Sequence, residues 1–194
     1  MTKKNRRRKN NSNPGLISIL GVGLVLVGLA AFLLLQGANN TKASQPVSRS
    51  VTPMEVNYPA PELSLQNVNG NTESLIDFRN KILLVNNWAT WCPPCKAEIP
   101  TLEAYYEAHA PAGFVIIGVE AGKGQNDVLT FAQEHGMTYP VWFDLTHAST
   151  SAFHNGSLPS SYVIDRNGNV RLAWVGEISQ EMLENYITPL LMEN

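Results

Sequence analysis

Residues 82–100 read ILLVNNWATWCPPCKAEIP and contain the only two cysteines of the 194-residue chain, Cys92 and Cys95. An apolar run of strand length precedes the pair, and a helical pattern follows it. Without further cysteines, the pair can belong neither to a framework of several structural disulfides nor to a four-cysteine metal cage. A Cys-x-x-Cys motif between a strand and a helix is typical of a redox-active dithiol.

The spacing of the two cysteines assigns them different roles. Residues i and i+3 on the first turn of a helix can bring their Cα atoms into disulfide range. Cys92 falls at the helix start, where free N–H groups and the helix dipole favour the thiolate, which is the nucleophile. We therefore predict that Cys92 is the reachable, attacking sulfur and that Cys95 is the covered, resolving one. A static disulfide and a two-ligand metal site are the alternatives.

The residues between the cysteines predict a weakly stabilised thiolate. Neither Pro93 nor Pro94 has a backbone N–H group, so the Cys95 N–H is the main donor left for the Cys92 sulfur. A less stable reduced form means a lower reduction potential. The motif therefore predicts a reductant.

Charge is distributed very unevenly along the chain. The formal net charge is −2, yet six of the 14 Lys and Arg residues lie among the first nine residues. From residue 58 onward there are six basic and 15 acidic side chains, a net charge of −9. Nucleic-acid binding needs clustered basic side chains, so we expect no nucleic-acid partner.

The basic cluster precedes a candidate membrane span. Residues 16–35 carry no charge, and twenty helical residues extend about 30 Å, the thickness of a bilayer core. We predict a basic cytoplasmic tail (1–15) and a transmembrane helix (16–36) in the cytoplasmic membrane, with the rest of the chain outside. A cleaved signal peptide is the alternative, but its apolar region is usually only about 7–15 residues long.

The remaining chain divides into a tether and one domain. Residues 37–57 are rich in Asn, Ser, Thr and Pro, which indicates a flexible linker, and the domain is expected at 58–194. A hairpin is expected around 69–71. Further strands are predicted at 82–88, 114–120, 139–143, 162–165 and 170–175, and helices from the cysteine motif to 109, at 127–135, 146–153 and 179–191. This alternation predicts an α/β fold with a mixed sheet between helices.

Two segments resemble one protein family. The run 84–100 resembles the active-site segment of thioredoxin-fold proteins, and residues 158–165, LPSSYVID, resemble their cis-proline loop. The similarity is closest to the membrane-anchored TlpA/ResA-like branch of thiol–disulfide oxidoreductases. It implies a three-layer thioredoxin-like fold, in which the helix and strand between 125 and 143 form an extra unit. It also implies an extracytoplasmic enzyme with no cofactor.

The resemblance also implies partners. Protein disulfides would be the substrates, with apocytochromes awaiting haem attachment (cytochrome c biogenesis) and mis-oxidised extracytoplasmic proteins as two classes. An external reductant needs electrons, so a membrane thiol relay is the implied donor.

Five further residues enter the predicted site, in part through the resemblance. Pro159 is expected in the cis form, so that the backbone at Leu158 can pair with an extended substrate segment. Trp91 is expected to be exposed beside Cys92. Glu98 is either a solvated surface residue or a poorly solvated carboxylate that takes the Cys95 proton. Asn87 replaces a usually apolar residue and needs hydrogen-bond partners if buried.

Two other functions, thiol peroxidase and copper carrier, are alternatives for this sequence. A thiol peroxidase would share the extra helix–strand unit, but Ala89 stands where that family has Thr or Ser. A copper carrier would use Cys92, Cys95 and His154, since thiolates suit Cu(I). The four histidines form no metal-binding pattern, and no metal site is predicted.

Overall fold

The structure, a computed structural model, describes residues 51–193. The predicted tail (1–15), the predicted span (16–36) and most of the predicted linker lie outside the described residues. Within 51–193, no helix is long and apolar enough to cross a membrane.

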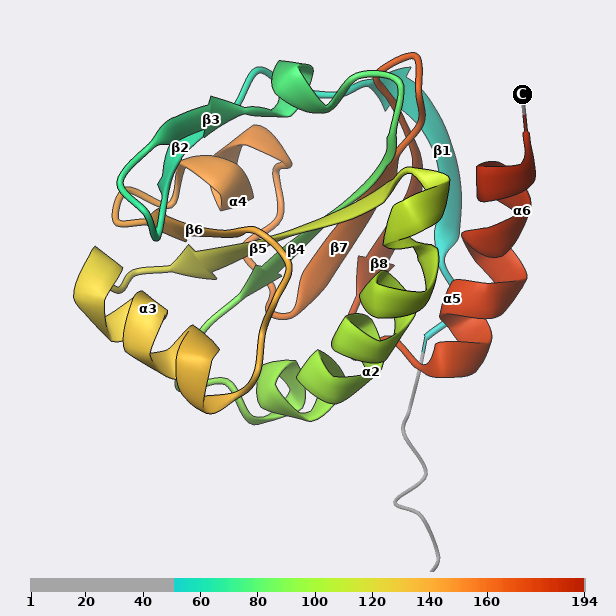
Figure 1. Ribbon diagram of the computed structural model, residues 1–194. Coiled ribbons are helices and arrows are strands. Elements are labelled where there is room, and N and C mark those ends of the chain that lie inside the picture. Colours follow the sequence, from blue (N-terminus) through green and yellow to red (C-terminus); the bar gives the residue numbers. More distant parts are fainter. Residues whose placement is uncertain (1–50, 194) are drawn as a thin grey trace, which may run out of the picture. The chain divides into compact units, whose positions relative to one another are not determined.

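Strands and helices alternate along most of the described chain (Figure 1). The strands are β1 (Met54–Pro59), β2 (Ser64–Asn67), β3 (Thr72–Ser74), β4 (Ile82–Trp88), β5 (Phe114–Ala121), β6 (Val141–Asp144), β7 (Ser160–Ile164) and β8 (Asn169–Val175). The helices are α2 (Pro93–His109), α3 (Gln125–Glu134), α4 (Ala148–Ala152), α5 (Gln180–Tyr186) and α6 (Thr188–Met192), with 3-10 turns η1 (Leu75–Phe78) and η2 (Ala110–Ala112).

The strands form one mixed sheet in the order β1-β8-β7-β4-β5-β6-β2-β3. The pairs β4–β5 and β5–β6 are parallel, and the other pairs are antiparallel. Every residue of β4 and β5 is buried. Strands covered on both faces are expected to be continuously apolar, which explains the runs in the sequence. The predicted mixed sheet is confirmed.

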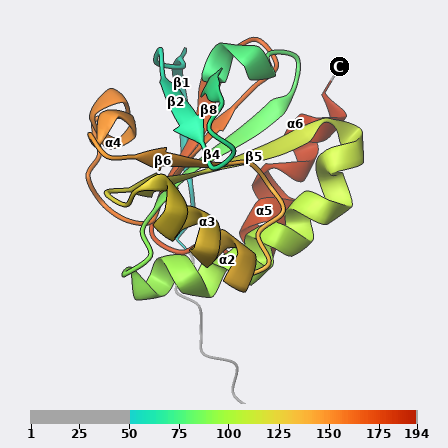
Figure 2. The same cartoon turned by 60° about the vertical axis from the view of Figure 1, so that its left-hand side comes forward.

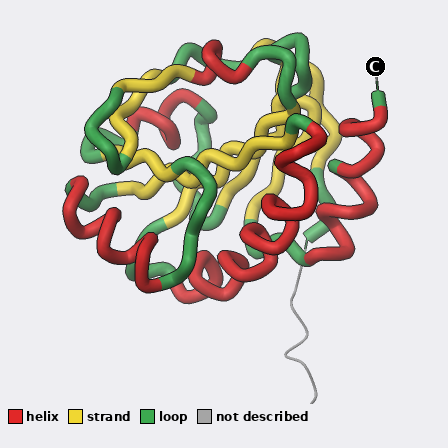
Figure 3. Tube along the Cα trace, viewed as in Figure 1, coloured by secondary structure: helices red, strands yellow, loops and turns green. Residues whose placement is uncertain are grey.

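Helices cover both faces of the sheet (Figures 2 and 3). Side chains alternate along β4, so Leu84 joins the core under α2, α3 and α5, and Val85 joins the opposite core. The second core also contains Phe153, just after α4, and Leu63 and Leu75 next to the β2–β3 hairpin. The cysteine segment therefore leaves the sheet from a fully buried central strand.

The first strand begins four residues before residue 58, the predicted start of the domain. Strand β1 begins at Met54 and pairs antiparallel with β8 at the edge of the sheet. Its side chains are almost all exposed, but Met54, Val56 and Tyr58 alternate with polar residues, and this period of two was an available strand signal. Its extended form depends on pairing with β8. The hairpin β2–β3 forms as predicted, and β7 and β8 pair antiparallel as a second hairpin.

The predicted last helix is divided in two. Ser179 caps α5 through its hydroxyl, which accepts the Met182 N–H at 3.4 Å, as the sequence indicates. The chain then breaks at Ile187, and Pro189 falls in the first turn of α6. Proline has no N–H for a helix interior but fits a first turn, so it ends one helix and starts the next.

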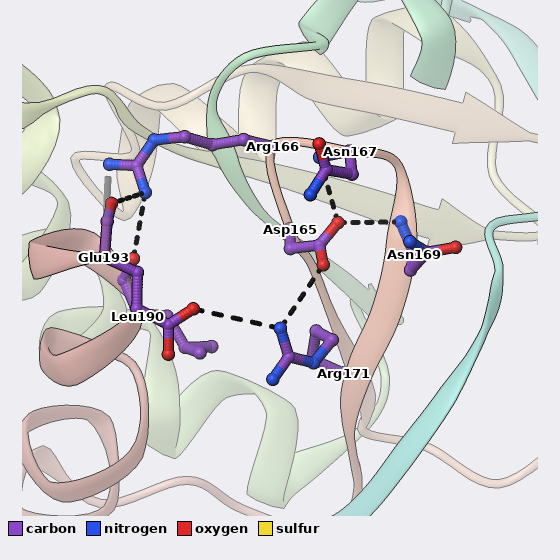
Figure 4. Close-up of polar contacts among 7 residues, drawn as sticks. All are labelled: Asp165, Arg166, Asn167, Asn169, Arg171, Leu190 and Glu193. Atoms are coloured by element: carbon purple, nitrogen blue, oxygen red, sulfur yellow. Dashed lines mark hydrogen bonds and ion pairs between the residues drawn. The ribbon is translucent and has the colours of Figure 1, made fainter.

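The turn between β7 and β8 holds the end of α6 (Figure 4). The Arg166 guanidinium donates to the carbonyl groups of Leu190, Leu191 and Glu193 at 3.0, 3.0 and 2.7 Å. Next to it, the Asp165 carboxylate accepts two N–H groups of the turn at 3.0 and 2.9 Å. Carbonyl groups at a helix end lack partners within the helix, so Arg166 satisfies them and secures the last helix to the sheet.

Candidate functional site

The two cysteines lie where β4 passes into α2. They form a disulfide with an S–S distance of 2.03 Å and a Cα–Cα distance of 5.3 Å. Cys92 is the N-cap of α2, which runs to His109 as predicted. The pairing that the i, i+3 spacing predicts is therefore present.

The two sulfurs differ little in exposure. Cys95 is 0% exposed, as predicted, but Cys92 is only 3% exposed, and both belong to the core under α2. The expectation of an openly reachable Cys92 is wrong for this oxidised form, in which Cys92 and its disulfide partner both pack into the core under α2. Reduction removes the disulfide bond. The neighbouring Trp91 is 65% exposed.

One backbone donor reaches the Cys92 sulfur. The Cys95 N–H lies 3.3 Å from the Cys92 Sγ. An N-cap side chain normally accepts from the second or third helical residue, and here the second is Pro94, which has no N–H. The expected donor is confirmed.

Glu98 is a buried carboxylate. It is 1% exposed, so it is not a solvated surface residue. Its Oε1 accepts from the Asn86 amide nitrogen at 2.8 Å, and its Oε2 accepts from the Ile178 N–H at 3.1 Å. Strand β4 and the loop before α5 thus hold the carboxylate under the first turns of α2.

Burial raises the pKa of Glu98 to about 8. Loss of hydration is the largest cause, because it penalises the charged form. The hydrogen bonds from Asn86 and Ile178 act in the opposite direction, and the nearby Glu177 charge adds to the rise. Glu98 can therefore exchange a proton near neutral pH, as a general acid or base must.

Two asparagines connect β4 to the segment after the proline loop. Asn86 donates to the Ser161 Oγ at 2.9 Å as well as to Glu98. Asn87 is 0% exposed; it accepts from the Ser149 Oγ at 2.6 Å and donates to the Ser160 Oγ at 3.4 Å. Asn87 therefore has the partners that its burial requires. Sequence reasoning missed Asn86, although a polar residue inside an apolar strand is a visible signal.

The proline loop lies next to the cysteine segment. The Leu158–Pro159 bond is cis, as expected. Ser160 pairs with Asn87 near the end of β4. The preceding residue, the buried Pro159, therefore lies at the end of the sheet from which the cysteine segment leaves. The Pro159 carbonyl is occupied by the Gly176 N–H at 2.8 Å. Leu158 is half-buried and packs against the core that contains both cysteines.

A second buried carboxylate, Glu120, was also missed. It is 0% exposed at the end of β5, and its two oxygens accept the N–H groups of Thr90 at 3.2 Å and Lys123 at 2.7 Å. Burial is the largest cause of its raised pKa. The two hydrogen bonds and the Lys123 charge lower the pKa, and the Asp127 charge raises it. A charged residue at the end of an otherwise apolar strand was the available signal.

The described part of the chain contains no cluster of three or more His, Cys, Asp or Glu side chains that could hold a metal ion. Cys92, Cys95 and His154 therefore do not form one in this oxidised state. His154 is exposed and precedes the proline loop.

Comparison with known proteins shows the family to which the chain belongs. Residues 56–173 match the AhpC/TSA family. The chain belongs to this family. Among curated relatives, it is 32% identical over 136 residues to the thiol-disulfide oxidoreductase ResA of Geobacillus kaustophilus (70% of this chain, 78% of the relative). It is 30% identical over 128 residues to ResA of Bacillus subtilis (66% and 72%).

Solved structures of thiol:disulfide interchange proteins have the same fold as this chain. A putative thiol:disulfide interchange protein DsbE from Chlorobium tepidum has a TM-score of 0.66 and 26% identity, covering 71% of this chain and 99% of that protein. The thioredoxin-like fold and the resemblance to ResA are thus confirmed. This AhpC/TSA-family protein is a thiol–disulfide oxidoreductase with a disulfide-forming cysteine pair.

Proposed function

We propose that this protein is a membrane-tethered reductant of protein disulfides outside the cytoplasm. The observation that carries the proposal is the Cys92–Cys95 disulfide at the start of α2, where, among residues 51–193, the Cys95 N–H is the one hydrogen-bond donor to the Cys92 sulfur. A thiolate with few donors is poorly stabilised, so its dithiol gives up electrons readily.

The reaction has two exchange steps. The Cys92 thiolate attacks one sulfur of the substrate disulfide, forming a mixed disulfide and releasing the other substrate sulfur as a thiolate that takes up a proton. The Cys95 thiolate then attacks the Cys92 sulfur and releases the second substrate sulfur. The substrate gains two electrons and two protons, and the enzyme is left with the Cys92–Cys95 disulfide.

Glu98 is the base for the second step. Cys95 is fully buried and must lose its proton before it attacks. Glu98 lies three residues later on the same helix, and its pKa of about 8 suits it to accept that proton and later return it.

Trp91, Leu158 and Pro159 form the substrate surface. The exposed Trp91 ring offers apolar contact beside Cys92. The backbone before Pro159 offers an edge for an extended substrate segment. Ala89 is fully buried and has no hydroxyl, so it does not supply the Thr or Ser hydroxyl that a thiol peroxidase has at this position.

Apocytochromes awaiting haem attachment and mis-oxidised extracytoplasmic proteins are the substrate classes. A membrane thiol relay returns the enzyme to its dithiol form. These partners are proposed from the relationship to ResA, and the tether from the apolar run 16–36.

The reduction potential tests the proposed direction. We expect a value nearer to about −270 mV than to about −120 mV, measured by equilibration with glutathione or dithiothreitol buffers. Pro94→Ala restores the missing N–H at the second helical position and stabilises the thiolate. A hydrogen bond to a charged group contributes about 1.5–3 kcal/mol, so the potential should rise by roughly 30–60 mV. A wild-type value near the oxidant end would refute the reductant role.

Cell fractionation tests the tether. We expect the full chain to stay with membranes after a high-salt wash, because about 20 apolar residues insert into lipid rather than bind by charge. A chain that begins at residue 51 should be released with the soluble fraction. Release of the full chain by salt, or loss of its first 40 residues on maturation, would rule out an uncleaved anchor.

A further inference from the structure

The Glu120 carboxylate is placed where it can control the active-site loop. It lies at the end of β5, paired in register with Trp88 of β4 and Phe143 of β6. Its backbone is therefore fixed by strands on both sides. Its Oε1 accepts the N–H of Thr90, two residues before Cys92 and next to the exposed Trp91.

We propose that Glu120 is a positioning residue for disulfide exchange, which holds the loop 89–91 so that Trp91 and Cys92 meet a protein substrate together. The proposal rests on the proposed function, since it takes Cys92 as the attacking sulfur and Trp91 as a substrate contact. No other role is assigned to Glu120: it does not touch the sulfurs in any hydrogen bond of the described residues.

The chemistry of the carboxylate suits this role. Two donors approach it from two loops, Thr90 before α2 and Lys123 before α3, and each needs its own acceptor oxygen. An ionised carboxylate supplies both, whereas an amide supplies one acceptor and places an NH2 group against the other N–H. The Glu120 side chain is itself 0% exposed and both contacts are partly buried, so an N–H left without its acceptor there costs stability.

The loop has few internal constraints of its own. The Cys92 N–H bonds to the Ala89 carbonyl at 3.0 Å, which closes the turn around Thr90 and Trp91. The Trp91 side chain projects into solvent and is not held by the core. Glu120 therefore connects the exposed substrate contact to the rigid centre of the sheet.

The role depends on ionisation. The charged groups that act on Glu120 are Lys123, which favours its ionised form, and Asp127, which disfavours it. Because burial raises the pKa of Glu120, its carboxylate becomes protonated at a higher pH than that of an ordinary glutamate. Protonation removes an acceptor, so the loop should loosen as pH falls through that pKa.

The test is a double-mutant cycle of Glu120→Gln and Trp91→Ala in the full chain in detergent, with insulin and 2-hydroxyethyl disulfide as probes. Glu120→Gln should raise the KM for insulin about tenfold, the order of effect of losing one hydrogen bond to a charged group, with kcat nearly unchanged. The small disulfide, which needs no Trp91 contact, should react within about twofold of wild type. In the Trp91→Ala background, Glu120→Gln should change the insulin KM by less than about twofold.

Glu73→Gln is the matched control. Glu73 also accepts two hydrogen bonds, from Asn67 and Trp142 at 2.9 and 2.7 Å, but it lies on β3 away from the cysteine segment. Glu73→Gln should lower the free energy of unfolding measured in urea. It should change the activity on insulin and on 2-hydroxyethyl disulfide to the same extent. If Glu120→Gln does not fold, Glu120→Asp, which keeps the charge on a shorter side chain, takes its place in the cycle.

Each outcome is decisive. Equal losses on both probes, or effects that add in the double variant, would overturn the positioning role and leave Glu120 as a structural residue. If the wild-type chain itself does not reduce insulin, the proposed function fails instead.

Discussion

Replacing Cys95 with serine should turn the enzyme into a trap that holds its substrate as a stable mixed disulfide. Cys95 is the only other thiol in the chain, and its Cα lies 5.3 Å from that of Cys92. A serine hydroxyl cannot attack a disulfide, so the first exchange step proceeds and the second does not. Turnover of protein disulfides should fall by roughly a thousandfold or more, as for other residues that act as a unit.

The trapped species is measured directly. Cells that express the Cys95→Ser chain should yield adducts on non-reducing gels that dissociate with dithiothreitol, and mass spectrometry identifies the bound proteins. An adduct with an extracytoplasmic apocytochrome would support that substrate class. Cys92→Ser is the control and should form none, because the proposed roles make Cys92, at the N-cap of α2, the sulfur that attacks the substrate. Abundant adducts with Cys92→Ser would reverse the assigned roles.

Replacing Glu98 with glutamine should remove much of the pH dependence of stability in the oxidised enzyme. Burial raises the pKa of Glu98 from about 4.5 to about 8 on folding, because the neutral form is favoured inside the protein. The stabilising contribution of the neutral acid is complete below pH 4.5 and is lost as pH rises through 8. The linkage relation gives a loss of about 4 kcal/mol over this interval.

Urea unfolding of the oxidised protein between pH 5 and 9 measures this effect. Glu98→Gln adds a constant cost, since its amide group faces the Asn86 and Ile178 donors, but its difference from wild type should shrink as pH rises. Glu107→Gln, an exposed position on the same helix, is the control and should follow wild type. A constant difference between Glu98→Gln and wild type at all pH values would mean that Glu98 is already ionised at pH 5.

The same variant separates a proton-transfer role from a structural one. Resolution of the mixed disulfide should accelerate in the wild-type enzyme as pH rises toward 8 and Glu98 becomes a base. Glu98→Gln should lack this step in its pH profile. An unchanged profile of disulfide exchange would exclude Glu98 as the proton acceptor of Cys95.

Much of the fold follows from local sequence signals. Strand β4 and helix α2 have the predicted limits, because an apolar run, an N-terminal capping position and paired prolines act within a few residues. The edge strand β1 alternates Met54, Val56 and Tyr58 with polar residues, but this short pattern does not show its pairing, because its hydrogen bonds come from the distant β8. The same holds for the division of the last helix, which Pro189 permits but does not require.

The location of the redox chemistry follows from the amino-acid order alone: two cysteines three residues apart, with prolines between them, at the start of a helix. The surroundings of the two cysteines depend on how distant segments pack. Glu98 is buried because Asn86 and Ile178, 12 and 80 positions away in the chain, close over it. Glu120 reaches Thr90 across 30 positions. Burial and hydrogen-bond partners depend on packing between distant segments, and it is burial that moves a carboxylate pKa into the range where it can serve catalysis.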